Sequence, residues 1–219
     1  MKKLFVVGDS ISIQYGPYLK RMVEHRFRYD RKRGEQEALA DLDNPVGANG
    51  GDSRMVLEYL EQERDKGMRC DVLLINCGLH DIKTDPASGE QQVPLHTYRD
   101  NLAQIARVAR QVSDLLIWIR TTDAVDHIHN ARTAAFRRSH SHVLAYNEAA
   151  DAVMQDAEVP VIDLYTFTRV FGDEAYCDHV HFTDHVRNLQ AAYIAGCLAG
   201  MRFNEDHQEE NSSHGQAPQ

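Results

Sequence analysis

The stretch FVVGDSISIQYG, residues 5–16, places a Gly-Asp-Ser turn between an apolar run and a segment of mixed polarity. The run at residues 4–7 is typical of a buried strand, and apolar residues then recur at helical spacing through residue 27. A serine at a strand-to-helix turn is exposed, and its backbone N–H has no acceptor within the helix. Gly8 allows a tight turn and the close approach of a substrate. The stretch therefore predicts a strand, a polar site and a helix in immediate succession.

Further apolar runs predict more buried strands, and the amphipathic segments between them predict helices. The strand segments are residues 71–76, 115–119 and 161–164, and the clearest helical segments are residues 98–112, 143–156 and 186–201. Residues 28–50 are polar and leave room for one more short strand. Strands that are apolar throughout and alternate with helices are typical of a parallel sheet covered on both faces. We therefore expect an α/β three-layer sandwich with a central, mostly parallel sheet of about five strands.

The composition is that of a globular protein, and 219 residues suffice for one domain with a sizeable core. The net charge of -9 argues against a nucleic-acid-binding protein, which usually carries a basic face. No segment is long and apolar enough to span a membrane, and the apolar run after Lys3 is too short for a signal peptide. We therefore expect a cytoplasmic protein without membrane insertion. Its domain is expected to cover residues 1–203, and residues 204–219, almost without apolar side chains, are expected to form a disordered tail.

Residues with catalytic chemistry follow the predicted strands. The first strand ends on Gly8-Asp9-Ser10, the second on Gly78-Leu79-His80-Asp81, and the segment after the last strand contains Asp178-His179-Val180-His181. Ligands of parallel α/β sheets bind beyond the carboxyl ends of the strands, so these side chains are expected at one rim. A serine, a histidine and an aspartate in one place are the residues that nucleophilic acyl transfer needs.

In these motifs the sequence resembles the SGNH (GDSL-type) hydrolases, over about residues 3–200. The family's first block matches Gly8-Asp9-Ser10, and its second block resembles Asn49-Gly50-Gly51-Asp52-Ser53. Its third block usually reads Gly-x-Asn-Asp, so His80 stands where the family has an asparagine. Its fifth block, Asp-x-x-His, matches Asp178 and His181. The resemblance implies the flavodoxin-like fold of this family.

The resemblance also implies roles for these residues. Ser10 is the implied nucleophile, His181 its general base, and Asp178 the carboxylate that orients His181. The implied oxyanion hole consists of the N–H groups of Ser10 and Gly51, with Gly50 as the alternative to Gly51, and of the His80 side chain. An imidazole N–H can donate to an oxyanion as an amide does, but its protonation can make the rate depend on pH. Asp9 and Asp81 are expected to order the loops around the site.

Two alternatives concern the histidines, of which the chain has 12. His179 and His185 compete with His181 for the role of base. The group Asp178, His179, His181 and His185, and the histidines within residues 127–142, could also be read as metal ligands. Their spacings match no metal motif, and the four cysteines lack C-x-x-C spacing. The sequence therefore predicts no metal and no cofactor.

The expected substrate is a small ester, most of all an O-acetyl ester of a carbohydrate or another small polar alcohol. The pattern GDSISIxYxPY with GLHD is similar to a branch of the family whose members resemble carbohydrate esterases. A lipolytic esterase or thioesterase for longer acyl chains is the alternative within enzymes, although no long apolar lid segment is visible. A non-catalytic binding protein and a metal-dependent hydrolase are the alternatives from other classes.

Overall fold

The computed structural model describes residues 1–201 and 203, so the expected tail, residues 204–219, lies outside the described residues. Within them, a five-stranded parallel sheet has the strand order β2-β1-β3-β4-β5. The strands are β1 (Lys2–Val7), β2 (Phe27–Arg31), β3 (Cys70–Ile75), β4 (Ser113–Ile119) and β5 (Val161–Ile162). This is the strand order of flavodoxin-like folds. The expected parallel sheet is confirmed, and β2 is the short strand for which the polar segment left room.

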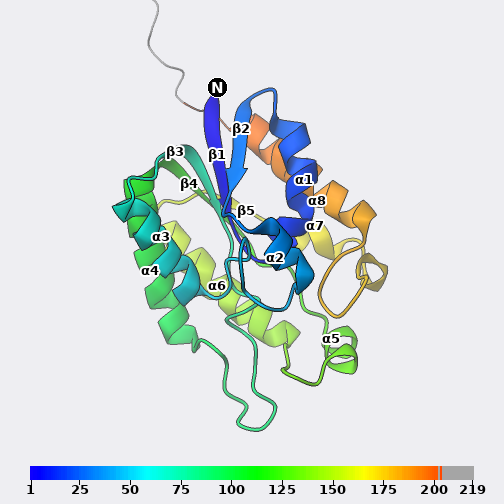
Figure 1. Cartoon of the computed structure of the whole chain (residues 1–219). Helices are drawn as coiled ribbons and strands as arrows, with labels where there is room; N and C mark the ends of the chain where they lie inside the picture. Colours follow the sequence, from blue (N-terminus) through cyan, green and yellow to red (C-terminus); the bar gives the residue numbers. More distant parts are fainter. Residues whose placement is uncertain (202, 204–219) are drawn as a thin grey trace, which may run out of the picture.

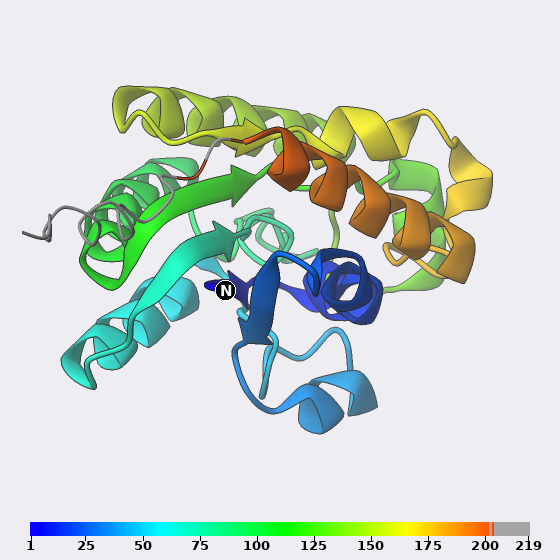
Figure 2. The same cartoon turned by 90° about the horizontal axis from the view of Figure 1, so that it is seen from above.

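Helices cover both faces of the sheet (Figures 1 and 2). One layer contains α1 (Ser10–Val23) and α8 (Asp184–Gly200), which pack against each other, and α7 (Leu164–Arg169) packs on α8. The opposite layer contains α3 (Ser53–Asp65), α4 (Leu95–Val112) and α6 (His140–Asp156). Short helices interrupt the connections: α2 (Glu35–Ala40), α5 (Asp126–Arg132) and the 3-10 helix η1 (Asp173–Ala175). The three-layer sandwich is confirmed. The helices α2, α5 and α7 were not predicted, because each is too short for apolar residues to recur at helical spacing.

The central strands are buried because helices lie on both sides of them. Leu4, Val7, Leu73 and Leu74 are fully buried, as the continuous apolar runs predicted. Trp118 on β4 is likewise a core residue. No helix in the described part of the chain has the length and apolarity needed to cross a membrane.

The register of the sheet brings the predicted motifs together. Val7 pairs with Ile75, so β1 and β3 end side by side and their polar loops leave the sheet at the same edge. Gly8 forms an isolated parallel bridge with Asn49, and the N–H of Gly50 donates to the carbonyl oxygen of Gly8 at 2.8 Å. The second motif, residues 49–53, therefore lies along the Gly8-Asp9-Ser10 turn, the predicted nucleophile turn. A side chain at Gly8 would meet the side chain of Ser12 at 2.9 Å, so the turn requires glycine.

Candidate active site

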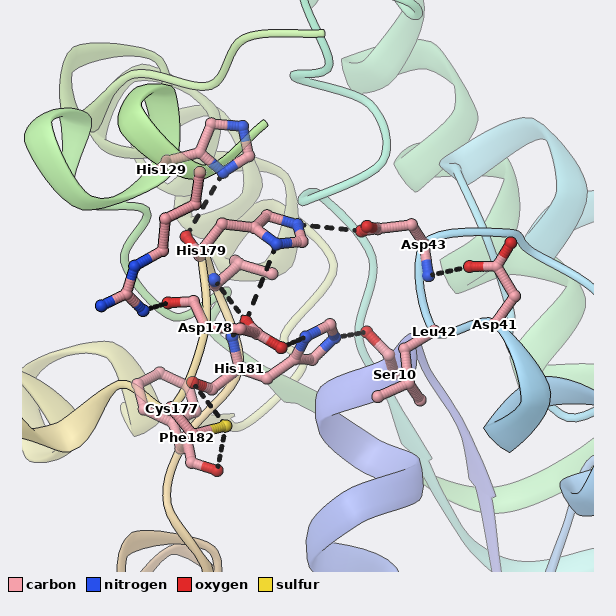
Figure 3. Close-up of polar contacts among 12 residues, drawn as sticks. Ser10, Asp41, Leu42, Asp43, His129, Cys177, Asp178, His179, His181 and Phe182 are labelled. Carbon is pink, nitrogen blue, oxygen red and sulfur yellow. Dashed lines mark hydrogen bonds and ion pairs between the residues drawn. The ribbon is translucent and has the colours of Figure 1, made fainter. Parts of the chain in front are cut away.

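Ser10, His181 and Asp178 form a continuous chain of hydrogen bonds (Figure 3). Ser10 is the first residue of α1, and its Oγ lies 2.8 Å from Nε2 of His181. The expectation that this serine is exposed was wrong: Ser10 is buried, because it packs against the His181 ring. Nδ1 of the same ring lies 2.8 Å from Oδ2 of Asp178. The structure thus brings together three side chains that the sequence analysis assigned to one catalytic unit.

Asp178 is held by its own loop. Its Oδ1 accepts the backbone N–H groups of Val180 at 2.9 Å and His181 at 2.7 Å. Burial raises the pKa of Asp178, but the hydrogen bonds from the His181 side chain and from this backbone outweigh it, and the pKa lies well below its usual range. The carboxylate therefore stays ionised and keeps the proton of His181 on Nδ1. Nε2 is then free to accept the hydrogen bond that the Ser10 hydroxyl donates.

The competing histidines have other partners or positions. Nε2 of His179 lies 3.0 Å from Oδ1 of Asp43, and burial of that carboxylate is outweighed by His179, so that the pKa of Asp43 is lowered to about 2. His129 Nδ1 donates to the carbonyl oxygen of His179 at 3.3 Å. His185 is exposed on α8. Of these histidines, His181 is the one whose ring contacts Ser10, and Asp43 is a partner that no motif had indicated.

Asp9 orders the nucleophile turn, as expected. It is the N-cap of α1, where its Oδ1 accepts the N–H of Ile11 at 3.0 Å, and its carbonyl oxygen accepts the Ser12 hydroxyl at 2.7 Å. Burial raises the pKa of Asp9. The first N–H groups of a helix have no acceptor within that helix, which leaves the N–H of Ser10 available to an oxyanion.

The two glycines proposed for the oxyanion hole differ in how their N–H groups are used. The N–H of Gly50 is engaged in its backbone hydrogen bond to Gly8. The N–H of Gly51 donates to the side-chain oxygen of Asn49 at 3.0 Å. Gly51 has φ +71°, and a Cβ there would lie 2.5 Å from the sulfur of Met55, so this position requires glycine. A side-chain acceptor is displaced more easily than a backbone pair, so Gly51 remains the better prediction for the oxyanion donor.

His80 lies in the loop between β3 and α4 and is 2% exposed. Burial lowers the pKa of His80 well below its usual value, and the charges of Lys83 and Arg138 lower it further. The ring is therefore neutral near pH 7. Its Nδ1 is buried and has no hydrogen-bond partner among the described residues. Nδ1 of histidine is as many bonds from the backbone as Nδ2 of asparagine, so it can take the place of the family's amide donor.

Asp81 connects the loop after β3 to the second motif, residues 49–53, by a hydrogen bond. Its Oδ1 accepts the N–H of Ser53 at 2.9 Å, and Asn101 donates to the Ser53 hydroxyl at 2.9 Å. Asp81 is fully buried, and burial raises its pKa to about 7. Its Oδ2 has no hydrogen-bond partner among the described residues.

Asp81 makes stability depend on pH in a direction that can be measured. Because its pKa is raised on folding, the unfolded chain loses the proton first, and the contribution of Asp81 to the free energy of unfolding falls as pH rises from about 4 to about 7. One such group contributes a slope of at most about 1.4 kcal/mol per pH unit. Asp81→Asn removes this contribution, so the slope of its free energy of unfolding against pH, measured by urea denaturation across that range, should be more positive than that of the wild type. The exposed control Asp100→Asn should leave the slope unchanged, and an equal slope in Asp81→Asn would contradict the assignment.

Two further histidines, His127 and His140, pair with carboxylates at a separate cavity. His140 Nδ1 lies 2.8 Å from Oδ1 of Asp123, and His127 Nε2 lies 2.7 Å from Oδ2 of Asp173. These four residues are part of the lining of a cavity of about 270 Å³. Among the described residues, no group of three or more His, Cys, Asp or Glu is arranged to hold a metal ion.

A serine-histidine-aspartate chain at the carboxyl edge of a doubly wound sheet is the arrangement that serine hydrolases use for acyl transfer. A model of the GDSL-like lipase/acylhydrolase family matches residues 6–186. The chain therefore belongs to this family and is a carboxylic ester hydrolase. A search of curated proteins found no significant match.

Solved structures with the same fold share little sequence with this chain. A lipase/acylhydrolase from Enterococcus faecalis has a TM-score of 0.68 and 20% identity, covering 91% of this chain and 96% of its own. An acetylxylan esterase from Geobacillus stearothermophilus has a TM-score of 0.66 and 15% identity, and the match covers 92% of this chain and 95% of the esterase. A carbohydrate acetylesterase from Sinorhizobium meliloti has a TM-score of 0.61 and 11% identity, and the match covers 91% of this chain and 99% of the acetylesterase. At these identities, the likeness establishes the fold.

Proposed function

We propose that this protein is a serine esterase that removes O-acyl groups, most of all O-acetyl groups, from a carbohydrate or another small polar alcohol. The observation that carries the proposal is the hydrogen-bonded chain from Ser10 through His181 to Asp178. This arrangement suits a serine nucleophile for two reasons. Nε2 of His181 can accept the Ser10 proton, and Asp178 stabilises the imidazolium that then forms.

The reaction proceeds through an acyl-enzyme. Ser10 attacks the ester carbonyl, and His181 takes the proton and returns one to the leaving alcohol. The N–H groups of Ser10 and Gly51 and the ring of His80 bind the oxyanion, and each such donor typically lowers the barrier by about 3–4 kcal/mol. For Gly51 to donate, the substrate oxygen takes the place of the Asn49 side-chain oxygen. Water then cleaves the acyl-enzyme with His181 again as base.

The preference for acetyl esters of carbohydrates is supported by two lines of argument. Structural neighbours of this fold include an acetylxylan esterase and a carbohydrate acetylesterase. Polar side chains also lie beside the Ser10–His181 pair: the ring centroid of His179 is 5.8 Å from that of His181, and His179 is bonded to Asp43. Polar groups that are well placed favour a hydroxylated alcohol over an apolar chain. Hydrolysis of longer acyl chains is the competing specificity.

The proposal is tested by labelling and by substrate comparison. Incubation with a p-nitrophenyl methylphosphonate ester should release one equivalent of nitrophenol and leave the phosphonyl group on Ser10, as read by peptide mass spectrometry. Wild-type kcat/KM should be higher for p-nitrophenyl acetate than for p-nitrophenyl octanoate, and acetylated xylo-oligosaccharides should release acetate. Preference for octanoate would instead support a lipolytic enzyme. No labelling and no turnover by a folded protein would contradict the esterase mechanism and favour a binding protein.

A further inference from the structure

Arg138, which lies between α5 and α6, is a buried cation that the proposed mechanism does not use. The residue is 2% exposed. Its Nε donates to the carbonyl oxygen of Leu79 at 2.7 Å, whereas Nη1 is buried without an acceptor among the described residues. The guanidinium thus has a hydrogen bond at Nε, while its buried Nη1 has no acceptor among the described residues.

The carboxylates near Arg138 are bonded elsewhere. Asp43 pairs with His179 and Asp178 pairs with His181, although both carboxylates feel the charge of Arg138 at longer range. Burying a cation removes its hydration, which only close ion pairs or several hydrogen bonds replace. The ring of Phe136, 4.8 Å from the guanidinium carbon, compensates only weakly.

The charge persists in spite of this environment. Burial lowers the pKa of Arg138 to about 10, which leaves the side chain protonated at neutral pH. The resting protein therefore carries a fixed positive charge beside its catalytic loops, and no carboxylate among the described residues forms an ion pair with it.

The position of Arg138 connects it with the oxyanion donor. The carbonyl oxygen that it binds belongs to the peptide between Leu79 and His80. On the other side of His80, its carbonyl oxygen accepts the backbone N–H of Lys83 at 3.2 Å. The charge also reaches the nucleophile turn: burial raises the pKa of Asp9, and the charges of His181 and Arg138 oppose that rise. Arg138 thus contacts the backbone next to His80, and its charge is felt at Asp9, the residue before Ser10.

We propose that Arg138 is a positioning residue for the oxyanion hole, which holds the Leu79–His80 peptide in place and supplies a preorganised positive charge for the tetrahedral intermediate. This inference rests on the proposed function. As Ser10 Oγ bonds to the carbonyl carbon, its proton passes to His181 and the π electron pair of C=O moves onto oxygen. On collapse the pair re-forms C=O, the C–O bond to the alcohol breaks, and the leaving oxygen takes the proton from His181.

The carbonyl oxygen is negative only in the tetrahedral intermediate and its flanking transition states. A fixed positive charge nearby therefore favours these states over the neutral substrate, so its loss should lower kcat and leave KM nearly unchanged. A purely structural arginine would not give this division between kcat and KM.

The test measures kcat and KM for p-nitrophenyl acetate in Arg138→Met, Arg138→Lys and the matched control Arg137→Met. Arg137 is the adjacent, exposed arginine, and its variant should differ from the wild type by less than about twofold. Arg138→Met should lower kcat by about 10²-fold with KM within about threefold. Arg138→Lys keeps the charge and a single donor, and should lose about tenfold in kcat.

A double-mutant cycle with His80→Ala separates the contribution that passes through His80. In the His80→Ala background, Arg138→Met should cost a smaller factor in kcat than in the wild type, because the positioned donor is already missing. Equal factors in both backgrounds, or a rise in KM with unchanged kcat, would overturn the proposal. If Arg138→Met does not fold, the same division between kcat and KM is read from Arg138→Lys.

These outcomes are distinct from failure of the proposed function. A wild-type protein that neither turns over p-nitrophenyl acetate nor labels at Ser10 would refute the esterase mechanism itself. An active, labelled wild type with no effect of Arg138→Met on kcat would refute only the role of Arg138.

Discussion

Ser10→Ala is expected to lower kcat for p-nitrophenyl acetate by about 10⁴- to 10⁶-fold, with the protein still folded. The substitution removes the oxygen that His181 contacts at 2.8 Å, so no acyl-enzyme can form. Residual turnover should reflect only the attack of water assisted by the oxyanion donors and by binding. The measurement is initial-rate hydrolysis with a chelator present throughout.

The control for this experiment is Ser12→Ala, two residues further along the same helix. Ser12 is also buried, but its hydroxyl donates to the carbonyl oxygen of Asp9 and accepts from the Arg31 guanidinium. We expect its activity to stay within about tenfold of the wild type, with some loss of stability. Full activity of Ser10→Ala, combined with loss of wild-type activity in chelator, would instead establish a metal-dependent hydrolase.

Asp178→Asn is expected to lower kcat by about 10⁴-fold while leaving the fold intact. The carboxyl is placed by its own backbone contacts to Val180 and His181, which the oxygen of an asparagine can retain. The side-chain NH₂ would then face Nδ1 of His181 and donate to it. The ring would have to carry its proton on Nε2, where it could no longer accept the proton of Ser10.

Asp173→Asn is the matched control because Asp173 lies in the same loop region and pairs with the exposed His127. Its kcat should remain within about twofold of the wild type. The tautomer itself can be followed by ¹⁵N NMR of the His181 ring, whose Nδ1 should lose its proton in Asp178→Asn. A variant with near-normal kcat would mean that Asp178 does not orient the base.

The local features of this protein were readable from the sequence because short-range rules govern them. Continuous apolar runs predicted β1, β3 and β4, since parallel strands between two helical layers bury both faces. The strand β2 has only its two end residues, Phe27 and Arg31, buried, and so it left no apolar pattern. Short helices such as α5 carry too few residues for a helical period to emerge.

For the candidate site, the sequence by itself determined which residue types stand at the ends of the strands. It also determined the Asp-x-x-His loop, in which the Asp178 carboxylate accepts hydrogen bonds from backbone N–H groups two and three residues later. The tertiary structure decided which side chains meet. Ser10 and His181 lie 171 residues apart, and they meet where α1, which begins at Ser10, packs against α8, which follows His181. The burial of Arg138 also depends on a contact between loops, since its Nε donates to the carbonyl oxygen of Leu79, 59 residues away in the chain. Burial and long-range pairing are properties of the packed chain, and it is these that set the charges and hydrogen bonds of the site.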